Sequence, residues 1–171
     1  GEGHLVTNSA LEIDGQMYYF DASGAMYGQE SVTSGWQEEN GNRYYYSNGN
    51  KVVNKGIEID GYWYYFGANG AMYRSQWRDK GGAKYYYDGE GHLITGKGVE
   101  IGGYWYYFDN SGAMYRSKWR DKAGVKYYYD GKGHLVTNKG LQIGSFWYYF
   151  DISGAFYTSQ WRDLAGLLLY Y

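Results

Sequence analysis

Aromatic residues recur along the chain in runs of three or four, and each run is followed by a short polar stretch. In the clearest example residues 105–108 read Trp-Tyr-Tyr-Phe, and residues 109–112 read Asp-Asn-Ser-Gly. A strand-forming run bounded by turn residues predicts a β-hairpin, which we expect to continue into a return strand over residues 113–115. Because side chains alternate along a strand, Trp105 and Tyr107 are expected on one face, and Tyr106 and Phe108 on the other.

The hairpin pattern repeats throughout the chain in two alternating forms. Type A occupies residues 63–73, 105–115 and 147–157, with a weaker copy from residue 17; type B occupies residues 84–95 and 126–137, with a looser copy at 43–53. The spacing from Phe108 to Tyr129 is 21 residues, and so is the spacing from Tyr129 to Phe150. The sequence therefore predicts an all-β solenoid of stacked β-hairpins, built from ~21-residue repeats with a 42-residue A/B superperiod.

Two kinds of connector join the repeats. A Trp connector precedes each type B unit, at residues 75–80, 117–122 and 159–164, and an aliphatic connector precedes type A, at 55–59, 97–101 and 139–143. The first copy carries extra residues at 27–35, which we expect to form a looped-out bulge.

We expect residues 1–171 to form a single repeat array. It would hold four type A hairpins, three complete type B hairpins and a half-hairpin at each end, because residues 1–7 match 131–137 and residues 169–171 match 127–129. The chain is then a fragment of a longer protein. The two half-hairpins are complementary, so the C-terminal strand of one molecule could pair with the N-terminal strand of the next.

Composition narrows the classes of ligand. The chain has 25 Tyr, 7 Trp and 28 Gly but no Pro and no Cys, so Gly, Asn and Asp must form the turns, and the apolar surface comes from amphipathic aromatic rings that suit sugars. A net charge of −2 gives no electrostatic footprint for nucleic acid. Apolar runs are far shorter than the ~20 residues of a membrane span, which predicts no membrane insertion.

Groups able to do chemistry all belong to the repeat. His4, His92 and His134 occupy equivalent positions beside a turn, so they should be too far apart to hold one metal. Asp21, Asp109 and Asp151 open type A turns, where a carboxylate usually accepts backbone N–H bonds. The sequence therefore predicts no catalytic residue, no metal site, no cofactor and no enzyme activity.

Repeated aromatic side chains can bind weakly but many times over. Trp and Tyr faces stack on sugar rings or enclose a quaternary ammonium, and regular spacing gives avidity on a polymer. Most Tyr rings are expected to fill the core, whereas the connector Trp residues precede polar Arg-Asp pairs that could contact hydroxyls. The candidate ligand-binding residues are Trp36, Trp77, Trp119, Trp161, Tyr86, Tyr128, Trp63, Trp105 and Trp147, with polar contacts from Arg78, Asp79, Arg120 and Asp121.

Type B reads Trp-x7-Tyr-Tyr-Tyr-Asp-x-x-Gly, and type A reads Gly-[Ile/Val]-x-Ile-x-Gly-x-Trp-Tyr-Tyr-Phe-x-x-x-Gly-Ala-Met. This pattern resembles the cell-wall-binding repeat superfamily, which includes choline-binding, glucan-binding and toxin oligosaccharide-binding repeats. The resemblance implies a hairpin solenoid with carbohydrate or choline sites between successive hairpins. Choline-binding repeats place Trp where this chain has Lys84 and Lys126. The type A sequence pattern is closer to that of glucan-binding and toxin repeats.

We therefore expect a non-catalytic module that anchors a secreted or surface-attached bacterial protein to a polysaccharide, either an α-glucan or a cell-wall glycan. The expected mechanism is stacking by Trp77 or Trp119, with Tyr86 or Tyr128 and Trp105 or Trp147, across a hairpin junction. One alternative is a choline-binding module on teichoic acid, and another is a structural or self-assembling spacer. The parent protein could be an enzyme, such as a glucansucrase or a lytic hydrolase.

Overall fold

The computed structural model describes residues 4–13, 16–31, 34–158, 161–164 and 167–170, and in these ranges it contains β-strands and no helix. The chain divides into two compact units. Unit 1 comprises Gly1–Arg74 with Gly89–His92, and unit 2 comprises Ser75–Asp88 with Leu93–Tyr171.

The strands are short. In unit 1 they are β1 (Ser9–Ile13), β2 (Gln16–Phe20), β3 (Met26–Ser31), β4 (Gly35–Glu39), β5 (Asn42–Ser47), β6 (Asn50–Lys51), β7 (Lys55–Ile59) and β8 (Tyr62–Phe66). In unit 2 they are β9 (Gln76–Lys80), β10 (Ala83–Tyr87), β11 (Gly98–Ile101), β12 (Tyr104–Tyr107), β13 (Lys118–Lys122), β14 (Val125–Tyr129), β15 (Lys139–Ile143), β16 (Phe146–Phe150), β17 (Trp161–Leu164) and β18 (Leu167–Tyr170).

The small sheets of the described chain are antiparallel: β1–β2–β3 and β4–β5–β6 have three strands, and each of the others is a two-stranded hairpin. In the hairpin of β13 and β14, Lys122 pairs with Val125, so Ala123 and Gly124 alone form the turn. Both turn residues have a positive φ, 52° and 80°, as the type I′ turn favoured by twisted hairpins requires. Asn40–Gly41 and Gly102–Gly103 repeat this geometry in other hairpins.

The strand pairing corrects the hairpin expected from the sequence. The aromatic strand pairs with the connector before it, as in Trp119 opposite Tyr128, so the connectors are themselves strands. The expected return strand after the Asp turn is reduced to a single bridge, such as Phe108 with Met114. The aromatic strand pairs across the two-residue glycine turn because that turn fits the twist of the strands. The longer Asp turn allows only one bridging pair.

At the C-terminal end β18 pairs with β17 along its whole length, as in the other hairpins, and the half-hairpin expected at residues 169–171 stays a prediction. One smaller expectation changes. The surplus residues of the first copy were expected to loop out, but Met26–Ser31 forms β3 and adds an edge strand to β2, with a register shift at Tyr19 and Phe20.

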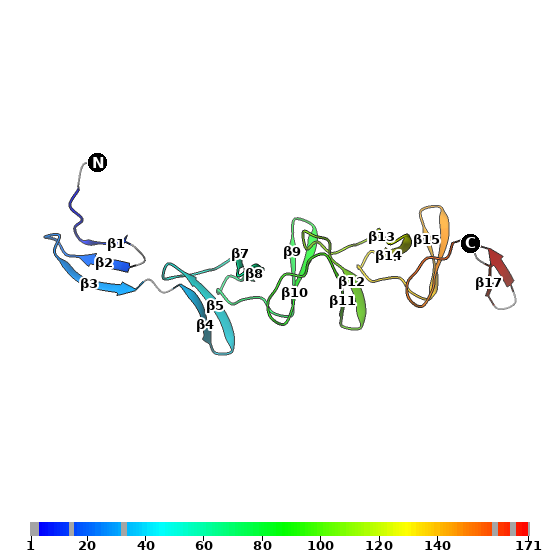
Figure 1. Ribbon diagram of the computed structural model, residues 1–171, viewed down its shortest axis with the longest axis horizontal. Coiled ribbons are helices and arrows are strands. Elements are labelled where there is room, and N and C mark those ends of the chain that lie inside the picture. The colour runs from blue at the N-terminus through cyan, green and yellow to red at the C-terminus, as the bar shows by residue number, and fades with distance from the viewer. Residues whose placement is uncertain (1–3, 14–15, 32–33, 159–160, 165–166, 171) are drawn as a thin grey trace. The chain divides into compact units, whose positions relative to one another are not determined.

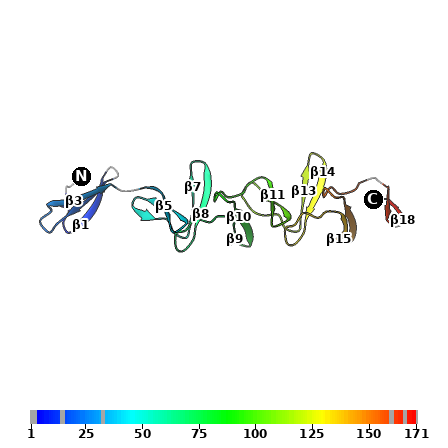
Figure 2. The same ribbon diagram turned by 90° about the horizontal axis from the view of Figure 1, so that it is seen from below.

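Successive hairpins are tied together by backbone hydrogen bonds from the segment after each Asp turn. In unit 2 the Met114 N–H donates to the Lys84 carbonyl at 2.8 Å, and the Phe156 N–H donates to the Lys126 carbonyl at 2.9 Å. Within this unit the β11–β12 and β15–β16 hairpins point in opposite directions in Figure 1, and β13–β14, seen end-on there, lies lengthwise in Figure 2. The architecture confirms the predicted all-β solenoid of hairpins.

One face of the aromatic run at residues 105–108 supplies the core, as the alternation predicts, whereas β14 and β16 each bury two neighbouring aromatic residues, Tyr128–Tyr129 and Tyr149–Phe150. Tyr106 is 9% exposed and Phe108 is fully buried, whereas Trp105, on the opposite face of the strand, is 50% exposed. Phe66 and Phe150 are equally buried at the equivalent positions. No helix in the described part of the chain is long and apolar enough to cross a membrane.

Candidate functional site: aromatic clusters at the hairpin junctions

The same aromatic cluster forms at three hairpin junctions. Its centre is a connector Trp, and its walls are a Tyr of the same hairpin and a Tyr of the following hairpin. Around Trp119 the ring centroids of Tyr128 and Tyr148 lie at 5.0 Å and 4.9 Å, and that of Phe150 lies at 5.8 Å. The equivalent sets are Trp77 with Tyr86, Tyr106 and Phe108 in unit 2, and Trp36 with Tyr45, Tyr64 and Phe66 in unit 1.

Strand alternation brings these rings together. Trp119 pairs directly with Tyr128 across the β13–β14 hairpin, so their side chains share a face. The next hairpin presents Tyr148 toward that face in an edge-on orientation, at an interplanar angle of 66°. Trp119 is partly buried and packs against the core cluster of Tyr128, Val136 and Phe150.

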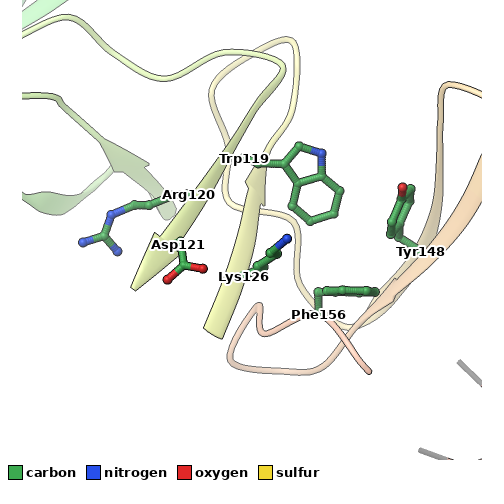
Figure 3. Close-up of a pocket in the computed structure, with 6 residues that line it drawn as sticks. All are labelled: Trp119, Arg120, Asp121, Lys126, Tyr148 and Phe156. Atoms are coloured by element: carbon green, nitrogen blue, oxygen red, sulfur yellow. The ribbon is translucent and has the colours of Figure 1, made fainter. Parts of the chain in front are cut away.

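A pocket of about 500 Å³ opens beside the Trp119 cluster. It is lined by Trp119, Arg120, Asp121, Lys126, Tyr148 and Phe156. Figure 3 shows the three aromatic side chains around one space, with Lys126 on the Trp119 side of the hairpin and Arg120 pointing away. Phe156 stands where the other two clusters have a buried Met, Met72 or Met114.

Each cluster has a cation of the chain beside its Trp. The Arg43 guanidinium lies 4.3 Å from the Trp36 ring centroid, and the Lys84 ammonium lies 5.9 Å from the Trp77 ring centroid. Lys84 also makes an ion pair with Asp79, its cross-strand neighbour, at 3.1 Å. Lys126 is placed opposite Asp121 in the same register, so the two opposite charges are cross-strand neighbours.

The structure separates the polar residues that the sequence grouped together. Arg120 and Asp121 alternate in β13, and so do Arg78 and Asp79 in β9. The Arg120 guanidinium stacks 3.9 Å from the Tyr107 ring centroid, away from the Trp119 ring. Asp121 accepts a hydrogen bond from the Gly124 N–H at 2.9 Å and so helps to close its own turn. Arg78 is half-buried in β9.

The type A tryptophans lie on the opposite side of their strands from the clusters. Trp63 and Trp105 are each 50% exposed, and Trp147 is 67% exposed. Trp105 and Trp147 are therefore not the cluster walls that the sequence analysis expected next to Trp77 and Trp119; Tyr106 and Tyr148 hold that place. Trp161 lies in β17, and its side chain is outside the described residues.

Sequence reasoning missed Tyr64, Tyr106 and Tyr148 as cluster walls, and it missed Phe156 as a pocket wall. A signal was present, because the aromatic strand puts its second and fourth residues on one face. The face of the aromatic strand that meets the connector Trp depends on which strand it pairs with. The sequence analysis paired it with the segment after the Asp turn, whereas it pairs with the connector before it.

The histidines form a second repeated contact. The His134 ring stacks on Tyr104 with centroids 3.9 Å apart, and the His92 ring stacks on Tyr62 at the same distance. His92 Nε2 also lies 2.9 Å from the Tyr64 hydroxyl oxygen. Among the described residues no group of three or more His, Cys, Asp or Glu side chains could hold a metal ion.

Two electrostatic features of the repeats have clear causes. Desolvation by burial acts to raise the pKa of the Asp109 carboxyl, but hydrogen bonds from the Ser111 hydroxyl and from backbone N–H groups, with the Lys118 charge, outweigh it and lower the pKa. Asp21 and Asp151 show the same direction. Burial raises the pKa of the Tyr106 hydroxyl, which keeps this cluster wall neutral.

Two protein-family models match the chain. The model described as a choline-binding repeat matches residues 76–119. The model described as a putative cell wall binding repeat matches residues 11–26, 34–50, 57–72 and 141–156. Together they cover more than half of the sequence, including the Trp36 and Trp77 clusters and, of the Trp119 cluster, Trp119, Tyr148 and Phe150 but not Tyr128.

Solved structures from Streptococcus pneumoniae have similar folds. Choline binding protein F is 30% identical, with a TM-score of 0.67, over 90% of this chain and 52% of that chain. The choline-binding domain of CbpL is 28% identical, with a TM-score of 0.62, over 81% of this chain and 73% of that chain. The modular autolysin LytC, at 24% identity and a TM-score of 0.67, shares the fold over 95% of this chain and 36% of that chain.

The chain thus spans about a third of LytC and about half of choline binding protein F. A comparison with curated proteins gave no match.

Proposed function

We propose that this chain, which belongs to the cell-wall-binding repeat superfamily, is a non-catalytic module that holds a bacterial protein at the cell surface by binding a wall polymer at several hairpin junctions. The observation that carries this proposal is the pocket at Trp119, where aromatic side chains from two hairpins surround one space. The Trp36 and Trp77 clusters repeat its central geometry.

The ligand that best fits the pocket is a quaternary ammonium, such as the choline group of a substituted wall polymer. Trp119, Tyr148 and Phe156 present ring surfaces to one space, and such rings attract a cation by about 0.5–2 kcal/mol each. The lining holds one carboxylate, Asp121, and two cations, Arg120 and Lys126, and the Arg120 guanidinium lies on the Tyr107 ring, away from the aromatic walls. Lys126 is therefore the cation nearest to those walls. The matches to choline-binding repeats and to choline binding protein F support this assignment.

A matched pair of lysine variants tests the choline assignment. Lys126→Ala removes an ammonium that lines the Trp119 pocket, so choline affinity should rise roughly 2- to 5-fold, as expected for loss of one partly screened like charge. Lys132→Ala removes the same charge from an exposed turn and should leave affinity unchanged. Choline binding is followed by tryptophan fluorescence and calorimetry.

Absence of any response to choline at tens of millimolar would rule out the ammonium ligand. If a glycan polymer bound in the same experiment, the proposal of wall binding would stand with a different ligand. A response to neither would leave only the spacer interpretation.

The second candidate ligand is a glycan, and a separate observation favours it. Trp63, Trp105 and Trp147 expose half or more of their surface at equivalent positions, which provides repeated flat platforms for sugar rings. The indole of Trp105 lies beside Gly98 of the paired strand, where an added Cβ would be in ordinary van der Waals contact with its Cε3, at 3.8 Å.

Replacement of an exposed tryptophan tests this candidate. Trp63→Ala should weaken retention on a wall polysaccharide by about tenfold or more, the usual effect of losing a Trp anchor, and should change the unfolding temperature little. Trp119→Ala is not a matched test, because its ring packs on the core and its loss should cost about 2–4 kcal/mol of stability. Unchanged retention of the Trp63 variant would contradict a role in stacking.

A further inference from the structure

The surface around Trp105 is a polar groove that adjoins the Trp119 pocket only at Arg120. One part, of about 290 Å³, is lined by Gly103, Tyr104, Trp105, Asp130, His134, Leu135, Thr137 and Lys139. Another part, of about 450 Å³, has a lining that includes Trp105, Arg120, Lys122, Leu135, Thr137 and Ser153. Both parts share Trp105, Leu135 and Thr137, so they form one groove divided by the exposed indole.

Strand alternation concentrates positive charge on this face. In β13, Arg120 and Lys122 line the groove, whereas Asp121 between them lines the Trp119 pocket. Arg120 lines both, but its guanidinium lies on the Tyr107 ring of the groove at 3.9 Å. Lys139 adds a third permanent cation at the far part of the groove.

Two carboxylates near the groove are already engaged. Asp130 Oδ1 accepts the backbone N–H bonds of Lys132 at 2.8 Å and His134 at 2.9 Å, and its Oδ2 lies 4.0 Å from His134 Nδ1. Asp151, next to the lining residue Ser153, accepts the Ser153 hydroxyl at 2.7 Å and its N–H at 2.8 Å. Among the residues that line the groove, three cations therefore face one carboxylate, Asp130, which is engaged in its own turn. Another carboxylate, Glu100, is the cross-strand neighbour of Trp105 but lies outside the lining.

Sugar recognition elements lie between these charges. The Trp105 ring offers a stacking face, and the hydroxyls of Tyr127, Thr137 and Ser153 can exchange hydrogen bonds with sugar hydroxyls. The Trp105 carbonyl accepts the Leu135 N–H at 2.8 Å, which fixes the strand that carries the indole. An aromatic platform between cations suits a polymer that has both sugar rings and negative charges.

We propose that the Trp105 groove is a second binding site, specific for an acidic glycan whose phosphate or carboxylate groups contact Arg120, Lys122 and Lys139 while a sugar ring stacks on Trp105. The inference rests on the proposed role of the exposed tryptophans in glycan binding, and it is independent of choline binding at Trp119. The sequence repeats the same residue types 42 positions earlier, at Trp63, Arg78, Lys80, Thr95 and Lys97.

The test is a double charge variant measured against two acidic polymers and one neutral polymer. Lys122→Gln with Lys139→Gln should weaken binding of choline-free, glucosylated polyglycerol phosphate, of polygalacturonate, or of both, by roughly 2- to 30-fold, as loss of two screened ion contacts implies. Neutral dextran should bind more weakly than the preferred acidic polymer, and raising the salt concentration should remove most of that preference. The polymer that responds identifies phosphate or carboxylate as the ligand group.

The control carries the same change of net charge elsewhere. Lys132→Gln with Lys55→Gln alters two exposed lysines outside the groove lining and should leave acidic-polymer binding unchanged. Trp105→Ala should weaken both acidic and neutral glycans about tenfold or more, since the platform itself is lost. The double groove variant should keep its fluorescence response to choline.

Equal binding of neutral and acidic polymers, or equal loss in the control variant, would overturn the acidic-glycan assignment. Single-stranded DNA bound as tightly as the acidic glycans would also overturn it, by making the groove a general polyanion site. If choline and dextran bind normally while acidic polymers do not, this inference fails and the proposed wall-binding function stands. If none of these ligands binds, the proposed function itself fails.

Discussion

Asp109 shows how one carboxylate closes the polar turn of a type A repeat. Its Oδ1 accepts the Ser111 N–H at 2.9 Å, the Ser111 hydroxyl and the Ala113 N–H at 3.0 Å. The sequence analysis predicted that this carboxylate accepts turn N–H bonds, and the prediction is confirmed. Asp21 and Asp151 make the same bonds in their repeats.

These bonds make the stability of the turn depend on pH. The pKa of Asp109 is lowered in the folded chain, so its ionised form contributes stability above the ordinary Asp pKa of about 3.9, and that contribution is lost as the pH falls through the folded value. Asp109→Asn should lower the free energy of unfolding by about 1 kcal/mol at pH 7, because charge-assisted bonds become neutral ones. The deficit should shrink as the pH falls below about 4.

Urea unfolding of both proteins at pH 7 and pH 3 measures the effect. Glu100→Gln, at an exposed position of β11, serves as the control and should behave like the parent chain at both pH values. A deficit that is the same at both pH values would mean that the carboxylate charge contributes nothing.

The roles of individual tryptophans were less predictable than the role of Asp109. An Asp turn is decided by groups within four residues, which the sequence contains. Trp105 and Trp119 are both strand residues beside aromatic neighbours, and only the pairing of strands makes Trp119 half-buried and leaves Trp105 50% exposed. The repeat period followed from the sequence, but the sequence analysis placed Trp105 in the aromatic cluster, whereas the structure places it on the opposite, exposed face.

At the level of the hairpin, the tightest turn decides which strands pair. Ala123 and Gly124 both adopt a positive φ, yet Ala123 is the only alanine among the described positive-φ residues. The equivalent positions in other hairpins hold Asn40, Asp60, Gly81 and Gly102, all of which tolerate this conformation better. The backbone at Ala123 is thus strained, whereas the equivalent residues of the other hairpins adopt this conformation at lower cost.

Changing the two turn residues should move stability in opposite directions. Ala123→Gly relieves the left-handed strain of about 1–2 kcal/mol but adds freedom to the unfolded chain, so a net gain of about 0.5 kcal/mol is expected. Gly124→Ala should cost about 1 kcal/mol, and the cost is conformational because an added Cβ meets no atom within 4 Å. Calorimetric unfolding temperatures of the two variants provide the comparison, and a shift of both in one direction would argue against a type I′ turn.

The hairpin also shows where sequence reasoning reached its limit. The 21-residue spacing, the all-β class and the alternation of faces followed from residues 105–129 alone. The pairing did not, because glycine turns stand on both sides of each aromatic run, as at Gly103 and Gly112. The register is fixed by the fit of the shorter turn to the strand twist, together with bonds to the neighbouring hairpin such as Leu135 to Trp105.

At the scale of the whole molecule, function depends on the number of equivalent sites. Trp36 in unit 1 and Trp77 and Trp119 in unit 2 lie 4.9 Å, 5.1 Å and 4.9 Å from the Tyr ring of the following hairpin. Clusters of such similar geometry should have similar intrinsic affinities. A ligand that enters one of them should therefore enter all three.

Calorimetric titration with free choline should thus give a stoichiometry close to three per chain, with weak affinity at each site. A polymer that bears several choline groups should bind about 10²–10⁴ times more tightly than free choline, because each further contact forms at a high effective concentration. Free choline in excess should then release the polymer. A stoichiometry of one would mean that the Phe156 wall, which only the Trp119 cluster has in place of Met72 or Met114, makes that pocket the sole binding site. In that case Met114→Phe should create a second site, and failure to gain one would show that matching aromatic walls do not suffice for binding.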